Sequence, residues 1–251
     1  MHTRHTQLLD FVNNENRISV ALLAQKLQVS EVTIRKDLDI LEKRGLLRRE
    51  HGFAVMIASD DIGHHLSFNY DNKRRIAQKA AASVKNGETV MIESGSCCAL
   101  LAEELATKRR GITIITNSAF IAAFIRKSPA ARIVLLGGDY QNESQVMVGP
   151  MLKKCVQDFF VDKVFIGTDG FTEKHGFTGN NLLRTEAIRA MAERANKIII
   201  LTESIKFSQQ GVVTQFKSEE IAAIFTDDHI PEEKKQFLQK LNTIIYTVPF
   251  E

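Results

Sequence analysis

The chain has 251 residues, of which 44% are hydrophobic and 25% are charged, and its formal net charge is +3. This balance is typical of a globular protein and excludes a fibrous or low-complexity chain, and no stretch is long and apolar enough to cross a membrane. The first residues lead into an amphipathic segment without the apolar core of a signal peptide, so we expect a cytoplasmic protein. The small positive charge favours a polyanionic partner.

The cysteines exclude two further classes of protein. There are three of them, Cys97, Cys98 and Cys155, and two are adjacent. An odd number with this spacing matches neither a disulfide framework nor a zinc site. We therefore expect buried reduced thiols, and we predict neither a metal nor a cofactor.

Residues 1–57 predict three short helices followed by a small β-hairpin, or wing. The first helix is expected from Arg4 to Asn14, the second after the capping residue Ser19, and the third from Ser30 to about Arg44. Two short strands are then expected on either side of Glu50-His51-Gly52-Phe53.

Residues 76–251 alternate apolar β-branched runs with amphipathic helical segments, and the polar stretch 58–75 before them predicts a linker. Strands are expected at Thr89–Ile92, Ile112–Thr116, Arg132–Leu136, Lys163–Gly167, Lys197–Leu201, Ala222–Thr226 and Thr243–Thr247. Helices are expected at Cys98–Lys108, Phe120–Arg126, Lys153–Phe160, Arg184–Arg194 and Glu232–Leu241. This alternation predicts an α/β domain with a mainly parallel sheet and helices on both faces.

The third helix and the wing carry residues suited to contact DNA. In a helix-turn-helix, the first turn of the second helix presents polar side chains and arginines to base edges and phosphates. The predicted DNA-binding residues are Ser30, Glu31, Thr33, Arg35, Lys36, Arg48, Arg49 and His51. The alternative is a solvated amphipathic helix with a salt-bridged outer face.

Polar, glycine-rich turns follow five of the predicted strands, and parallel sheets bind ligands at that edge. The helix expected after Gly95 offers free N–H groups to a phosphate, and Lys206 is a possible cationic partner. The predicted effector-binding residues are Glu93, Gly95, Ser96, Cys97, Thr116, Asn117, Ser118, Gly137, Gly138, Asp169, Gly170 and Lys206. Each turn alone is also explained by ordinary turn chemistry.

The segment from Ser30 to Leu38, together with Leu41–Arg49 and His51-Gly52, resembles the DNA-binding signature of the DeoR family of bacterial repressors. Phe53 stands where that family usually has a second glycine. The run from His51 to Val55 is similar to a subgroup of the family typified by YciT. The resemblance implies an N-terminal winged helix-turn-helix.

The resemblance extends over the second part of the chain. Gly95 and its flanks resemble the family's Asp-x-Gly-x-Thr loop, with Glu93 in place of Asp, and Glu203 to Phe207 resembles its Asp-x-Ser-Lys-Phe motif. This implies a C-terminal sensor domain that resembles ribose-5-phosphate isomerase and binds a phosphorylated sugar or related metabolite. The longer carboxylates and the hydroxyl lost at Ile205 suggest a different choice of sugar.

The sequence thus favours a transcription regulator that is a repressor, binds double-stranded operator DNA, and forms a dimer or tetramer because a single helix-turn-helix binds weakly. One alternative is a sugar-phosphate isomerase with Asp169 and Lys206 in catalytic roles. However, Phe171-Thr172 follow Gly170 where that enzyme has a second Asp. Another alternative is an interaction module without a ligand.

Overall fold

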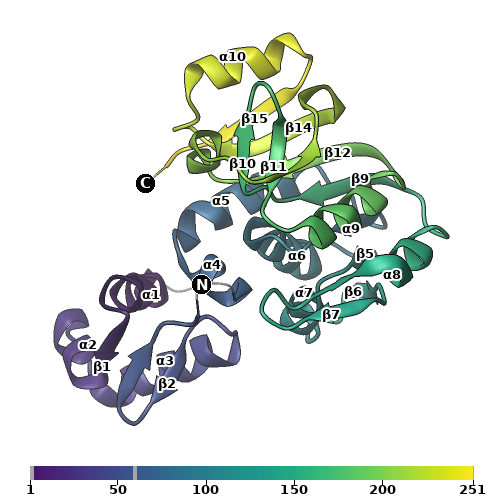
Figure 1. The fold of residues 1–251 in the computed structure, drawn as a ribbon. Coiled ribbons are helices and arrows are strands. Elements are labelled where there is room, and N and C mark those ends of the chain that lie inside the picture. Colours follow the sequence, from purple (N-terminus) through teal and green to yellow (C-terminus); the bar gives the residue numbers. More distant parts are fainter. Residues whose placement is uncertain (1–2, 59–60, 251) are drawn as a thin grey trace. The chain divides into compact units, whose positions relative to one another are not determined.

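The computed structural model describes residues 3–58 and 61–250, and the chain divides into two compact units between Asp71 and Asn72. Figure 1 labels the helices and strands of both units. The predicted fold class is confirmed, since three helices with a small antiparallel sheet come first and a parallel α/β sheet follows. No helix in the described residues is long and apolar enough to cross a membrane.

The first unit begins with a bundle of three helices. They are α1 (Thr3–Glu15), α2 (Val20–Leu27) and α3 (Glu31–Lys43). Ser19 and Ser30 cap the second and third helices, because their hydroxyls accept hydrogen bonds from the N–H groups of Leu22 and Thr33. Gln28 ends α2 in the left-handed conformation, with φ of 53°. Leu9, Leu23, Ile34, Leu38 and Leu41 are fully buried in this unit.

The wing is a three-stranded antiparallel sheet. Its strands β1 (Arg17–Ser19), β2 (Arg48–Glu50) and β3 (Phe53–Val55) lie in the order β1-β3-β2, and β1 was not predicted. His51 and Gly52 have positive φ, as a two-residue type I′ hairpin turn requires. Phe53 lies in β3, and the guanidinium of Arg17 stacks 3.7 Å from the centre of its ring. The wing therefore forms with Gly52 as the only glycine of its two-residue turn.

A carboxylate of α3 is tied to α1 inside the first unit. Asp37 accepts hydrogen bonds from Arg4 Nε at 2.5 Å and lies 3.0 Å from His5 Nε2, and its side chain is 8% exposed. Burial by itself raises the pKa of Asp37, but the hydrogen bonds from Arg4 and His5 outweigh it, so the pKa lies below its usual value. This contact fixes α3 against α1 through a charge as well as through packing.

The predicted linker 58–75 contains helix α4 (Ile62–Ser67) and the start of α5 (Tyr70–Ala81). Asp61 caps α4 by accepting the N–H of Gly63, and Asn13 Nδ2 donates to the carbonyl of Ser67. Ile62 and Leu66 are buried, so a few apolar residues suffice to order a polar segment. The domain boundaries drawn from the sequence stay a prediction.

The second unit is built on a seven-stranded parallel sheet. Its strands are β4 (Thr89–Ile92), β5 (Ile112–Thr116), β6 (Ala131–Leu135), β9 (Val161–Ile166), β12 (Ala195–Leu201), β14 (Ile221–Asp227) and β15 (Ile244–Val248). They lie in the order β15-β14-β12-β9-β4-β5-β6, and every pair is parallel. All seven predicted strands are present, so their carboxyl ends meet at one edge of the sheet.

Helices flank this sheet, as Figure 1 shows for α6, α9 and α10. The helices are α6 (Ser96–Lys108), α7 (Ala119–Ile125), α8 (Gly149–Val156), α9 (Leu182–Ala192) and α10 (Glu232–Lys240), with short 3-10 helices η1 (Ser204–Ser208) and η2 (Ser218–Glu220). Five short strands were not predicted: β7 (Asp139–Gln141), β8 (Val146–Val148), β10 (Gly170–Thr172), β11 (Gly176–Gly179) and β13 (Val213–Phe216). They form a hairpin and a separate sheet in the order β10-β11-β13.

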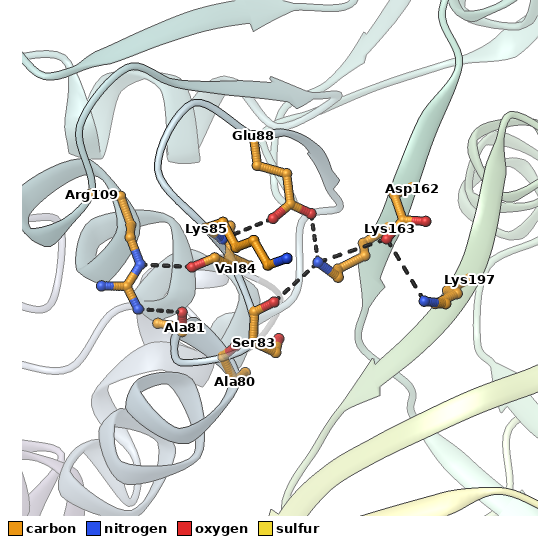
Figure 2. A network of polar contacts seen from close by, with 10 residues as sticks. All are labelled: Ala80, Ala81, Ser83, Val84, Lys85, Glu88, Arg109, Asp162, Lys163 and Lys197. Carbon is orange, nitrogen blue, oxygen red and sulfur yellow. Dashed lines mark hydrogen bonds and ion pairs between the residues drawn. The ribbon is translucent and has the colours of Figure 1, made fainter.

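Two cations anchor the C-terminal end of α5 at the edge where the strands begin. Figure 2 shows Lys163 between Glu88 Oε1, at 2.5 Å, and the carbonyl of Ser83, at 3.0 Å. Arg109 donates to the carbonyls of Ala81 and Val84. Ala81 is the last residue of α5, and Ser83 and Val84 lie in the turn after it, so these cations hold the segment that leads from α5 into β4.

We expect Asp37→Asn to destabilise the first unit by about 1–3 kcal/mol at pH 7. The pKa of Asp37 is lowered by folding, so its contribution is present above the unfolded pKa of about 3.9 and is lost as the pH falls through the folded value. Urea unfolding followed by circular dichroism should therefore show a gap between wild type and variant that closes below about pH 4. Asp39→Asn is the matched control, because its partner Arg49 and Asp39 itself are both partly exposed. A gap that does not change with pH would contradict this assignment.

Candidate functional site

The outward face of α3 carries exposed charges. Ile34, Leu38 and Leu41 face the core, and the opposite side presents Arg35 and Lys36 to solvent. The side chain of Arg35 is 50% exposed and pairs with Glu31 one turn earlier, with Nη2 2.5 Å from Oε2. Such an exposed pair adds little stability but orients the guanidinium along the helix.

The other predicted DNA-binding residues divide into two groups. Ser30 and Thr33 serve the helix start, since the Ser30 hydroxyl lies 3.0 Å from the Thr33 hydroxyl and accepts the Thr33 N–H. Arg48 is 64% exposed on the wing, whose turn contains the exposed His51. Arg49 instead forms an ion pair with Asp39 and donates its backbone N–H to Glu42, which ties β2 to α3.

At the carboxyl edge of the large sheet, Glu93 joins the ends of two neighbouring strands. Its Oε1 accepts the N–H groups of Gly95 and Gly167, both at 2.6 Å, and its Oε2 accepts the Ser94 hydroxyl at 3.1 Å. The side chain is buried, and burial raises the pKa of Glu93 despite these hydrogen bonds. A Cβ at Gly95 or Gly167 would lie within 3.0 Å of this carboxylate, so both positions need glycine.

The N-terminus of α6 follows directly after Glu93. Its N-cap, Gly95, makes no side-chain hydrogen bond, so the first N–H groups of this helix keep their capacity to bind an anion. Ser96 is half-buried at the first helical position, whereas Cys97 and Cys98 are buried. Burial raises the pKa of both thiols, with the nearby Glu203 carboxylate adding to the shift at Cys97. All three cysteines are free, but Cys155 is half-buried, so the prediction of burial is wrong for that residue.

Thr116, Asn117 and Ser118 are buried after β5. Two of them have structural partners, because Thr116 Oγ1 accepts the Ser118 N–H and Ser118 Oγ caps α7. Asn117 donates Nδ2 to the carbonyl of Met147, but its Oδ1 has no partner among the described residues although it is buried. Ile92 lies opposite Thr116, so Asn117 follows β5 at the level of Glu93.

The remaining predicted residues lie along the same edge with different environments. A Cβ at Gly138 or Gly170 would meet a backbone carbonyl at 2.5 Å or less, so both glycines are required by packing. Gly137 is exposed after β6. Asp169 accepts the N–H of Asn180 with one oxygen, and half-buried Lys206 donates to Gln209 Oε1.

Sequence reasoning missed a buried polar cluster at this edge. Lys73 Nζ lies 3.2 Å from Glu203 Oε2, with side chains 5% and 9% exposed. Asn72 donates to Asp227 Oδ2 at 3.0 Å, and the same oxygen accepts the N–H of Ser204 at 2.9 Å. Asn72 and Lys73 were assigned to the linker. The available signal was Asp227 itself, an acid directly after the predicted apolar strand Ala222–Thr226 and the last residue of β14.

A winged helix-turn-helix with a cationic outer face, followed by a parallel sheet with a polar carboxyl edge, defines a DNA-binding regulator with a sensor domain. The family model for the DeoR-like helix-turn-helix domain matches residues 4–60, and that for the DeoR C-terminal sensor domain matches residues 68–228. The chain therefore belongs to the DeoR family. Its subgroup stays a prediction.

Curated relatives match over nearly the whole chain. The HTH-type transcriptional regulator GolR of Listeria innocua is 30% identical over 90% of this chain and 91% of its own. The transcriptional repressor AccR of Agrobacterium fabrum is 26% identical over 98% and 93%, and the L-fucose operon activator of Haemophilus influenzae is 28% identical over 96% and 97%. These relatives are regulators, which confirms the prediction of a transcription regulator and not an enzyme.

Solved structures match this chain at low similarity. Ribose 5-phosphate isomerase A of Methanocaldococcus jannaschii is 20% identical, covers 55% of each chain and has a TM-score of 0.41. A probable sor operon regulator of Shigella flexneri is 10% identical, covers 68% of this chain and 88% of that one, and has a TM-score of 0.42. We draw nothing further from matches at these scores.

We expect Glu93→Gln to stabilise the protein increasingly as the pH rises. Gln keeps the carbonyl that accepts the two glycine N–H groups and removes the buried charge. Because folding raises the pKa of Glu93, its favourable contribution is present below the unfolded pKa of about 4.3 and is lost as the pH rises through the folded value. Melting temperatures of wild type and variant should therefore diverge between pH 4.5 and pH 8.

The control is Glu93→Ala, which leaves two buried N–H groups without an acceptor and should be less stable than Glu93→Gln by about 1–3 kcal/mol at every pH. Parallel melting curves for wild type and Glu93→Gln across this range would show that Glu93 carries its charge at no cost and would contradict the burial argument.

Proposed function

We propose that the chain is a transcriptional repressor whose operator affinity is controlled by a phosphorylated sugar, or a related phosphorylated metabolite, bound at the carboxyl edge of the large sheet. DNA would bind along α3 and the wing. The observation that carries the proposal is the uncapped N-terminus of α6 beside the buried, unpartnered oxygen of Asn117. The proposal of a repressor is supported by the relative AccR, which is named as a transcriptional repressor.

The DNA part of the proposal rests on the exposed cations of the first unit. Arg35 and Lys36 lie in the first turns of the second helix of a helix-turn-helix, where base edges are contacted. Arg48 projects from the wing, where phosphates lie in such complexes. Arg49 supports the surface from behind through its ion pair with Asp39.

The effector part rests on which polar groups at the sheet edge are already used. Glu93 and Asp227 are occupied by N–H groups of the chain itself, so they shape the site. The N–H groups at the start of α6 suit a phosphate, and the Ser96 hydroxyl lies at the same helix start. Asn117 Oδ1 can accept a sugar hydroxyl, and Lys206 can balance charge. Gly137 would allow close approach of the ligand, whereas Gly138 holds the loop against Val148 beside it.

Coupling between the two activities requires that the effector favour one arrangement of the protein over another. Helix α5 is a candidate route, because Asn72 and Lys73 near its start contact Asp227 and Glu203 at the effector edge. We also propose that the protein acts as a dimer or tetramer, since paired half-sites give a single helix-turn-helix usable affinity.

We expect Arg35→Ala to weaken binding to a sequence selected from random DNA by about 5–150-fold, corresponding to about 1–3 kcal/mol for a lost base contact. Arg48→Ala should instead weaken all sequences about equally and reduce the slope of affinity against salt by about one. Fluorescence anisotropy at several salt concentrations distinguishes the two. Lys240→Ala, on the exposed side of α10, is the control. If the variant with both arginines replaced bound DNA with wild-type affinity, the placement of Arg35 and Arg48 at the DNA would be wrong.

We expect Ser96→Glu to abolish the response to the effector while leaving DNA binding of the ligand-free protein near normal. The new carboxylate places a fixed negative charge where the phosphate would lie. A thermal-shift screen of phosphorylated metabolites identifies the ligand, since binding to the folded state raises its melting temperature. Operator affinity with and without that ligand then tests the variant.

Ser96→Ala is the matched control, because it removes the hydroxyl without adding charge and should weaken the response only partly. A response of Ser96→Glu equal to that of wild type would show that the phosphate lies elsewhere.

A further inference from the structure

Two large apolar side chains are exposed on α3, Val32 in its first turn and Ile40 near its end. Val32 is 58% exposed, more than any other large hydrophobic residue described in the first unit. It shares its face with Lys36, Asp39 and Lys43, which follow at intervals of four, three and four residues. The buried residues Ile34, Leu38 and Leu41 repeat with the same spacing on the opposite face. Val32 is therefore the first residue of the outward stripe.

The position of Val32 coincides with the part of the helix that enters the major groove. It is the second helical residue after the cap Ser30, and the N-terminal residues of such a helix contact base edges. Arg35 and Lys36 lie within the next turn, so the charges beside Val32 complement a polyanion rather than an apolar protein surface.

The chemistry of the groove limits what Val32 can contact. Base edges in the major groove present donors and acceptors, with one apolar group, the 5-methyl group of thymine. Valine has no polar atom in its side chain, and its branched Cβ holds both methyl groups in one preferred rotamer on a helix. A fixed apolar contact of this kind distinguishes thymine from cytosine, which lacks the methyl group.

We infer that Val32 contacts the 5-methyl group of one thymine in each half-site and thereby determines part of the operator sequence. This inference rests on the proposed docking of α3 in the major groove, and it adds a sequence-determining residue to the polar ones. It requires neither the effector nor a particular oligomeric state.

The test uses the full-length protein and DNA in which single methyl groups are removed. Binding sites are first selected from a random double-stranded library, and each thymine of the selected site is then replaced in turn by deoxyuridine. Wild type should lose about fourfold in affinity at one thymine position of each half-site, the effect of burying one methyl group. Val32→Ala should bind the thymine site about as weakly as wild type binds the deoxyuridine site, and should show no further loss at that position.

Two matched variants separate this contact from a general effect on the surface. Val32→Thr keeps one methyl group and should keep part of the sensitivity to deoxyuridine. Lys36→Ala should bind every site more weakly while its sensitivity to the same deoxyuridine stays that of wild type. Because Val32 is exposed, its replacement by Ala leaves the core intact, which circular dichroism and the melting temperature check.

The outcomes distinguish this inference from the proposed function. A selected sequence that binds equally well with every thymine replaced by deoxyuridine would overturn the methyl contact and leave DNA binding standing. Unchanged deoxyuridine sensitivity in Val32→Ala would assign the contact to another residue and overturn it as well. Failure to select any sequence would overturn site-specific DNA binding itself, and the role of Val32 with it.

Discussion

The hydrogen bonds of Glu93 determine the geometry on which the sensor unit depends. Parallel strands deliver their loops to one edge, but packing alone leaves each loop free to adopt several conformations. Glu93 removes that freedom for the two central strands β4 and β9, because one oxygen accepts N–H groups from both of the following loops. Gly95 and Gly167 must then be glycines, since a side chain would displace the carboxylate. The start of α6 is set by the same contact.

In the DNA-binding unit, too, a buried carboxylate holds a functional element in place. A helix that meets DNA must keep its outer face free, so it can be held only by its inner face. Leu38 and Leu41 provide apolar contact there, and Asp37 adds directional bonds to Arg4 and His5. Glu31 and Arg35 pair along the outside, so under the proposed docking only this exposed pair need rearrange when a base binds the guanidinium.

The seven strands of the large sheet could be predicted because each is a run rich in apolar residues, and an inner strand such as Ile112–Thr116 is buried on both faces. The strands β10, β11 and β13 could not, because three or four residues such as Gly170–Thr172 carry no periodicity of their own. Their pairing follows from tertiary contacts, including the close approach of Gly170 to Gln209. Helix α4 was not predicted for a related reason, since Ile62 and Leu66 are its only large apolar residues.

The candidate effector residues were predictable wherever a polar turn directly follows a strand, as at Glu93 and Asn117. The role of each residue was not predictable, because the sequence does not say whether Ser118 caps a helix or faces a ligand. Asn72 and Lys73 lie some 130 or more residues from their partners Glu203 and Asp227, and only folding brings them together.

These contacts between residues far apart in the sequence bear on the proposed regulation. Asp227 and Glu203, at the edge proposed for the effector, are bonded to the first turn of α5, the helix that follows the helix-turn-helix and α4 in the chain. An effector that rearranges Glu203 or Asp227 must change the bonds of Lys73 or Asn72, because a buried lysine cannot be left without its counterion at low cost. Coupling is reciprocal, so operator DNA that favours one arrangement of this helix changes effector affinity by the same factor. The sign of the response is therefore set by which arrangement each ligand selects.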